Sequence, residues 1–394
     1  MQVVSRNIKN IILKLIKQPS VILLILSIII FYFGWVSRNF AVCGFGATIF
    51  LLFLALMFKK IKILLIPFVA IGFTVSFIEL TLNILWPLII PESAKSTTFS
   101  KESNFTFQKV DGFGYLPTEG VFKDIKLNPD GETIYDATYT IGKDGYRLDV
   151  PHNEYQIYIY GGSLLFGNGL NDNETLSYFL FKNHGLKSKN LGIGGYGMHQ
   201  ALYNIQKGKT ASNGINILYT TPGHAHRSSC IPVYSSGTPR YILDKNKKLI
   251  LDGVCKNKIK LNNFLQSVYI FKLFERVFES TKYLSDEGIE TYLAIVKEFY
   301  RLTKQNNSKL IIVYFLNDKA DKSMKKNTKW SNKLIIDQYN NFADKTVNVT
   351  LAETYEQLPR KYYIHKLDTH PTAKANIERA IIIADTLKRL EEKN

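Results

Sequence analysis

The first ninety residues carry three long apolar runs, and this pattern limits what the chain can fold into more than any other. Residues 20–36, 41–58 and 63–90 contain almost no charged side chains. Each run is near or above the length that crosses about 30 Å of hydrocarbon at about 1.5 Å per residue. The first run is followed by two others and lacks the small-residue cleavage site of a signal peptide. We therefore expect residues 1–94 to form a membrane anchor of three transmembrane helices.

Basic residues around these runs predict their orientation. They concentrate before the first run and between the second and third, whereas the loop after the first run has only Arg38. The residues concerned are Arg6, Lys9, Lys14, Lys17, Lys59, Lys60 and Lys62. Since cytoplasmic loops are enriched in lysine and arginine, the N-terminus should be cytoplasmic and residues 91–394 extracytoplasmic, at a bacterial-type inner (plasma) membrane. Glu79 is the one acid within the runs, and it could face a helix partner or the outer interface.

Beyond residue 151, strand-like and helix-like stretches alternate. The strand-like stretches are 156–160, 188–193, 215–220 and 309–316. The helix-like stretches are 173–184, 198–208, 262–283, 287–305 and 329–342. This alternation predicts an α/β fold for residues 151–394, with a parallel sheet between two layers of helices.

Two further segments flank or interrupt this domain. Residues 95–150 carry alternating apolar residues and turn glycines, which predicts a small strand-rich module that could shape a substrate cleft or cover a sheet edge. The insertion at 228–261 contains a hairpin-like stretch flanked by Cys230 and Cys255. Outside the cytoplasm these two cysteines could form a disulfide, and the alternative is two separate buried thiols.

A serine follows the first strand of the α/β domain, and an acid and a histidine occur near the C-terminus. Ser163 ends the tripeptide 161–163, and Asp368 lies two residues before His370. A serine hydroxyl becomes a good nucleophile when a histidine accepts its proton and a third group orients the imidazole. These residues could therefore form a hydrolase triad, with the acid and the histidine on a loop before a C-terminal helix. The simpler alternative is that Ser163 only caps a helix.

Three blocks in this order resemble the SGNH/GDSL hydrolases. Residues 157–170 resemble block I, with Gly162 where an Asp usually precedes the serine, while 190–197 resemble block II and 367–371 resemble block V. The resemblance implies a three-layer α/β hydrolase fold without a cofactor. It also implies that Ser163 is the nucleophile and that Asp368 and His370 complete the triad. The family's oxyanion hole would use the N–H groups of Ser163 and Gly195 and a block III asparagine.

Block III departs from the family pattern. Residues 220–227 contain no asparagine, and His224 is the nearest polar donor at the matching place. Arg227 could bind an anionic group of a substrate or pair with a structural acid. His224 and His226 lie two residues apart, but no further cysteine or histidine cluster accompanies them, so we expect no metal.

These observations favour an extracytoplasmic serine esterase or O-acyltransferase. The resemblance implies ester chemistry, and the location suggests acyl groups, acetyl first, on an envelope glycan or exopolysaccharide, or a small ester substrate. The alternatives are a lipase or lysophospholipase, and a catalytically silent subunit that works with polysaccharide-assembly proteins. The net charge of +17 is spread along the chain without clustered aromatics, so nucleic acid is not an expected partner. The bilayer is the expected partner of residues 1–94.

Overall fold

The chain divides into two compact units. The computed structural model describes residues 19–36, 39–58, 62–89, 99–100, 103–128, 130–150, 154–231, 235–256, 268–270, 273, 284–316, 318–350, 362–365 and 368–392. The first unit comprises Met1–Lys95 and Ile259–Thr281, and the second comprises Ser96–Lys258 and Lys282–Asn394. The module expected at 95–150 thus shares a unit with the α/β domain. The helix expected at 262–283 lies almost wholly outside the described residues.

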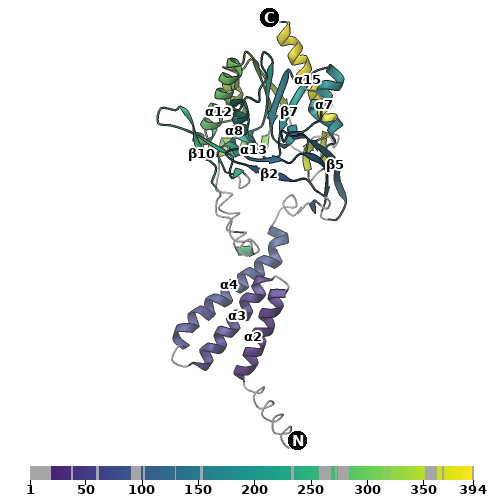
Figure 1. Ribbon diagram of the computed structural model, residues 1–394. Coiled ribbons are helices and arrows are strands. Elements are labelled where there is room, and N and C mark those ends of the chain that lie inside the picture. Colours follow the sequence, from purple (N-terminus) through teal and green to yellow (C-terminus); the bar gives the residue numbers. More distant parts are fainter. Residues whose placement is uncertain are drawn as a thin grey trace, which may run out of the picture. The chain divides into compact units, whose positions relative to one another are not determined.

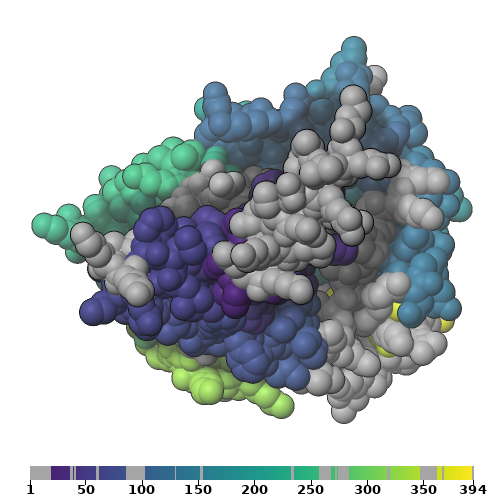
Figure 2. All heavy atoms as spheres, turned by 90° about the horizontal axis from the view of Figure 1, so that it is seen from below, coloured from purple at the N-terminus to yellow at the C-terminus, as the bar shows by residue number. Residues whose placement is uncertain are grey.

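Three apolar helices form the first unit. They are α2 (Pro19–Val36), α3 (Phe40–Met57) and α4 (Lys62–Ile89), and each packs against the next (Figure 1). In the space-filling view of Figure 2 their atoms, in purple and violet, gather into one group. Small residues allow this close approach: a Cβ atom added to Gly46 of α3 would lie 2.6 Å from the backbone nitrogen of Phe31 in α2.

Large apolar side chains cover the outer surface of these helices. Trp35, Ile63 and Phe77 are 66%, 86% and 66% exposed. Among the described residues, one helix segment, Lys62–Leu85, is both long and apolar enough to cross a membrane, and Pro19–Trp35 and Ala41–Met57 are shorter apolar helices. The three expected spans therefore form three helices, of which one meets the length requirement.

Glu79 is buried within the first unit. Its side chain lies on α4, and the residue is 5% exposed. Its carboxylate accepts hydrogen bonds from the backbone N–H groups of Tyr269, at 2.6 Å, and Ile270, at 2.9 Å. This acid therefore binds a segment that returns from the middle of the chain, rather than another of the apolar helices.

A five-stranded parallel sheet is the centre of the second unit. Its strands lie in the order β12-β11-β8-β6-β7. Their bounds are β6 (Ile157–Gly161), β7 (Ser188–Gly192), β8 (Ile215–Thr220), β11 (Lys309–Leu316) and β12 (Lys345–Thr350). The chain passes from β6 to β7 on one side, and it then crosses to β8 on the other side of β6. The loops after β6 and β8 therefore lead to opposite faces of the sheet. In open α/β sheets ligands bind at this point, beyond the carboxyl ends of the strands.

Helices cover both faces of this sheet. On one face α7 (Leu176–His184) and α15 (Ala373–Glu391) lie side by side, and α8 (Met198–Gln206) and α12 (Asp286–Gln305) cover the other (Figure 1). Side chains of each strand alternate between the two layers, as the two-residue period of a strand requires. In β11, Leu310, Ile312 and Tyr314 pack on the α8 and α12 side, whereas Ile311, Val313 and Phe315 pack on the α7 and α15 side.

The elements follow the expected α/β pattern with two additions. Helices α13 (Asp318–Asn327) and α14 (Asn332–Asn340) both follow β11, where a single helix was expected at 329–342. The edge strand β12 was not expected, because its residues alternate polar and apolar side chains rather than forming the apolar run typical of a buried strand.

Antiparallel strands precede and interrupt the α/β domain. Strands β4 (Gly120–Leu127) and β5 (Thr133–Ile141) pair along their length with the short β1 (Phe99–Ser100) beside β4, and β2 (Phe107–Val110) pairs with β3 (Gly114–Pro117). The insertion contains the hairpin of β9 (Pro239–Leu243) and β10 (Leu249–Val254).

Candidate active site

Ser163 lies on a tight turn at the carboxyl end of β6. Helix α6 (Ser163–Phe166) is a single turn whose N-cap is Gly162, and it ends at Gly167, which has a left-handed backbone. Ser163 is thus the first residue of this helix and not its cap, so the capping role considered from the sequence does not apply. The residue is half-buried. It follows the carboxyl end of a central strand, where ligands bind in open α/β sheets.

Asp368 and His370 lie on one short strand. They belong to β14 (Asp368–Pro371), which pairs antiparallel with β13 (Tyr363–His365), so the expected loop is instead a small ribbon. Residues two apart on a strand share a face. The Nδ1 atom of His370 lies 2.6 Å from Oδ1 of Asp368, and the same oxygen accepts the backbone N–H of His370 at 3.1 Å. Helix α15 follows directly, capped by Thr372, as expected.

The turn of Ser163 and the strand of Asp368 and His370 are neighbours. Helix α6 contacts β14 although about two hundred residues separate them in the chain. The side chain of Asp368 is 2% exposed and that of His370 is 24% exposed. The acid is therefore enclosed while the imidazole reaches solvent, as a triad requires.

The carboxylate of Asp368 stays ionised although it is buried. Burial is the largest single influence and raises the pKa of Asp368, but the hydrogen bonds and charge of His370 and the hydrogen bond from Lys126 together lower it by more. The Nζ atom of Lys126, on β4, lies 2.7 Å from Oδ2. The pKa of this carboxyl consequently lies well below its usual range.

His224 lies beside the serine turn. It belongs to α9 (Pro222–Ser228), which follows β8 and begins after the capping residue Thr221. A Cβ atom added to Gly162 would lie 3.0 Å from Nε2 of His224, so this nitrogen points at the residue before Ser163. Nδ1 lies 3.1 Å from Oγ1 of Thr220. Burial, with the charge of Arg227, lowers the pKa of His224 well below its usual value, so the ring is neutral.

Arg227 lies beside the same glycine. Its Nη1 atom donates to the carbonyl of Tyr196 at 2.8 Å, and a Cβ atom on Gly162 would lie 2.7 Å from it. A side chain at 162 would therefore require the end of the Arg227 side chain to move, whereas glycine leaves it in place. Gly195, on the same loop as Tyr196, has a φ of 83°, a conformation that glycine adopts readily.

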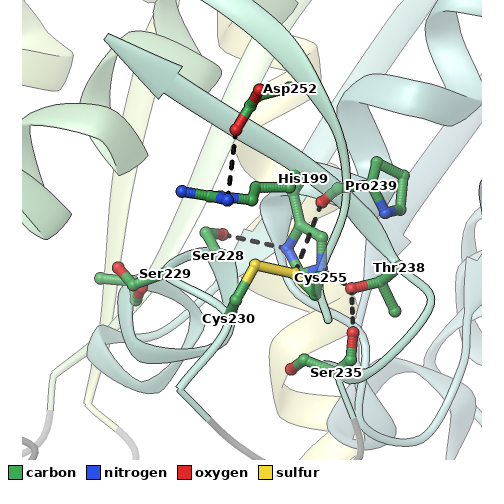
Figure 3. The surroundings of a disulfide bond; sticks show 11 residues. His199, Ser228, Ser229, Cys230, Ser235, Thr238, Pro239, Asp252 and Cys255 are labelled. Carbon is green, nitrogen blue, oxygen red and sulfur yellow. Dashed lines mark hydrogen bonds and ion pairs between the residues drawn. A yellow bond between two sulfur atoms is a disulfide. The ribbon is translucent and has the colours of Figure 1, made fainter. Parts of the chain in front are cut away.

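The structure joins Cys230 and Cys255 in a disulfide just beyond α9. Their Cα atoms are 5.5 Å apart, and Figure 3 shows the bond beside the ring of His199. His199 is enclosed between the hydroxyls of Ser228, at 3.3 Å, and Thr238, at 3.1 Å. Since Ser228 ends the helix that carries His224 and Arg227, the disulfide ties this helix to the β9–β10 hairpin.

The second histidine of α9 brings no metal site with it. Within the part of the chain that the structure describes, no three histidine, cysteine, aspartate or glutamate side chains gather closely enough to hold a metal ion. The ring of His224 is instead held by Thr220.

Two basic residues near the site, Lys126 and Arg147, belong to no sequence motif from which a role at the site could be predicted. The side chain of Arg147 is fully buried, and it donates from Nη1 to the carbonyls of Phe166 and Gly167, at 2.8 and 2.9 Å. Its Nε atom lies 2.8 Å from a carboxylate oxygen of Asp172. This arginine therefore binds the chain just after the serine turn.

Comparisons with known proteins give similarity at the level of the fold. No family model and no curated protein matches the chain. Among solved structures, a protein described as lipolytic and of the G-D-S-L family from Desulfitobacterium hafniense is 9% identical, with a TM-score of 0.34, and the match covers 58% of this chain and 98% of that one.

Two carbohydrate esterases are also similar. An acetyl xylan esterase from Butyrivibrio proteoclasticus is 12% identical with a TM-score of 0.31, and the match covers 63% of this chain and 67% of that one. A carbohydrate esterase family 2 enzyme from Corynascus thermopiles is 11% identical with a TM-score of 0.32, covering 75% and 93%. These values are too low to carry an argument about activity, so the function is argued from the residues of the site.

Proposed function

We propose that this protein is a membrane-anchored serine esterase or O-acyltransferase with Ser163, His370 and Asp368 as its triad. The observation that carries the proposal is the hydrogen-bonded pair of Asp368 and His370 on β14, in contact with the turn that begins at Ser163. A buried acid that holds a partly exposed imidazole beside a serine at the end of a central strand is the arrangement that activates a hydroxyl nucleophile.

The reaction follows from these roles. The Oγ atom of Ser163 attacks the acyl carbonyl while His370 accepts its proton, and Asp368 holds the Nδ1–H of the resulting imidazolium. The ester C–O bond then breaks, and the alcohol leaves with the proton from His370. Water, or a hydroxyl of an acceptor, attacks the acyl-serine with His370 again as the base. Water completes hydrolysis, whereas an acceptor hydroxyl completes transfer.

His224 is suited to act as the oxyanion donor in place of the block III asparagine of the SGNH/GDSL hydrolases. A neutral imidazole has one N–H, and a hydrogen bond from the Thr220 hydroxyl to Nδ1 would leave this N–H on Nε2, which points towards Gly162. The hydroxyl of Thr220 is itself 2.8 Å from that of Tyr292. The oxyanion hole would then combine this N–H with the backbone N–H groups of Ser163 and Gly195.

The substrate class is inferred from the cellular location that the rest of the chain suggests for the site. Helices α2 to α4 expose large apolar side chains all along their length, which supports embedding in lipid. The disulfide supports an oxidising location for the second unit. Acyl esters, acetyl first, of an envelope glycan or exopolysaccharide fit such a location. A lipid ester would fit as well, and the test distinguishes the two.

The first experiment is labelling of the full chain in detergent with a fluorophosphonate probe. The full chain is needed because Ile259–Thr281 belongs to the first unit and interrupts the second. We expect labelling of the wild-type protein, and none of Ser163→Ala or His370→Ala, since both remove the activated nucleophile. Turnover of nitrophenyl acetate, acetylated xylan and micellar phospholipid then identifies the acyl group and acceptor.

The matched control for the serine is Ser177→Ala. Ser177 is buried in the first turn of α7, and its hydroxyl has no hydrogen-bond partner among the described residues, so we expect this variant to label like the wild type. Absence of labelling in a folded wild-type protein would overturn the enzyme proposal and favour a silent assembly subunit. Preference for micellar phospholipid would replace the glycan substrate with a lipid.

A further inference from the structure

A lysine from outside the α/β domain completes the triad's hydrogen bonding. Lys126 is on β4 of the strand-rich module, and it lies 242 positions before Asp368 in the chain. Its ammonium donates a hydrogen bond to Oδ2 of Asp368, while Oδ1 is hydrogen-bonded to Nδ1 and the backbone N–H of His370. Both carboxylate oxygens therefore have charged or polar donors, and the rotamer of Asp368 is held from two sides.

This ion pair is largely removed from water. The side chains of Lys126 and Asp368 are 23% and 2% exposed, so solvent screens their attraction weakly compared with a surface pair. The ammonium also lies 5.9 Å from the centre of the Tyr135 ring. Tyr135 is fixed in turn, because its hydroxyl donates to Asp124 at 2.9 Å. The module thus presents Lys126 on a pair of antiparallel strands.

The other titratable and charged groups around the dyad come from several elements. Asp124 on β4 accepts hydrogen bonds from Tyr135 and Tyr139 of β5, and His365 of β13 lies opposite Asp368 in the ribbon. Lys126 is the charged group that donates to Oδ2 of Asp368.

We propose that Lys126 is a positioning residue of the triad, which fixes Asp368 for His370. The inference rests on the proposed esterase function. It assigns the strand-rich module a part in the active site, since the α/β domain without residues 99–150 would lack this hydrogen bond to Asp368.

The test compares Lys126→Met, Lys126→Arg and a matched control, Lys123→Met, in the full chain. Lys123 is on the same strand, but its side chain is 51% exposed and pairs with Asp136 at the surface. For Lys126→Met we expect kcat on nitrophenyl acetate to fall about tenfold or more with little change in KM, because the substrate still binds while the base is less well oriented. Lys126→Arg should restore the wild-type kcat, and Lys123→Met should retain it.

A second measurement does not depend on turnover. The 15N resonances of His370, assigned with His370→Gln, report its hydrogen bond to Asp368 in labelled protein. We expect these resonances to move in Lys126→Met and to stay in place in Lys123→Met. Unchanged resonances and an unchanged kcat in Lys126→Met would overturn the inference. Moved resonances in a protein that never labels with fluorophosphonate would instead overturn the proposed function and leave the inferred positioning standing.

Discussion

The side chains of Arg227 and His224 lie close beside Gly162 in the candidate site. They fill the space that a side chain at position 162 would occupy. A side chain at this place would require both to shift, so glycine is the residue that leaves their present arrangement intact.

The prediction at this scale concerns His224. We expect His224→Ala to lower kcat about a hundredfold to a thousandfold, the usual cost of one oxyanion donor, and His224→Asn to recover part of that loss because its amide can donate. Steady-state kinetics on nitrophenyl acetate measure both. The control is His226→Asn, on the same helix, which should keep wild-type activity. Equal activities of His224→Ala and the wild type would exclude His224 from the oxyanion hole.

Among the elements, the strand-rich module is fastened to the loop after α6. Arg147 makes this connection through the carbonyls of Phe166 and Gly167, and its guanidinium stacks over the rings of Tyr139 and Phe166. The serine turn is therefore held on one side by its own strand and on the other by this arginine. The module has a structural role here in addition to the role inferred for Lys126.

The prediction for this element is a loss of stability. Arg147→Met leaves several buried carbonyls and Asp172 without their donor, and we expect a loss of about 3–5 kcal/mol in the free energy of unfolding. Urea unfolding in detergent, followed by Trp330 in the second unit, measures it. Arg240→Met removes a surface pair with Asp252 in which both side chains are more than 40% exposed, and it should cost less than about 1 kcal/mol. Similar losses in the two variants would contradict the role of Arg147.

The whole molecule joins an apolar helical unit to an α/β unit that contains a disulfide. The apolar unit favours a bilayer, and the disulfide favours an oxidising compartment. Together they predict that the protein resists extraction from membranes by carbonate and carries the α/β unit on the extracytoplasmic side.

Thiol counting tests this arrangement. The chain has three cysteines, and Cys43 is the one outside the disulfide. After denaturation in SDS, we expect maleimide-polyethylene glycol to add once without reduction and three times after reduction. Cys255→Ser should give two additions without reduction. Three additions to the unreduced wild-type protein would contradict the disulfide and remove its support for the extracytoplasmic location.

The local pattern of the sequence predicts much of the fold. The strands 215–220 and 309–316 and the helix 287–305 are found within a residue or so of their expected ends, because buried strands are continuous apolar runs and α12 has a helical apolar period. The edge strand β12 could not be predicted in this way, since an edge strand needs no continuous run of apolar residues.

The sequence by itself determined the candidate triad and the α/β class, because these follow from local periodicity and from short motifs in a fixed order. Only the tertiary structure decided that Lys126 meets Asp368, that Arg147 binds the serine loop, and that Arg227 and His224 crowd Gly162. A single lysine or arginine in a strand carries no periodic signal. Its partner is chosen by chain segments up to 242 residues away, and that choice exists only once those segments have packed together within the second unit.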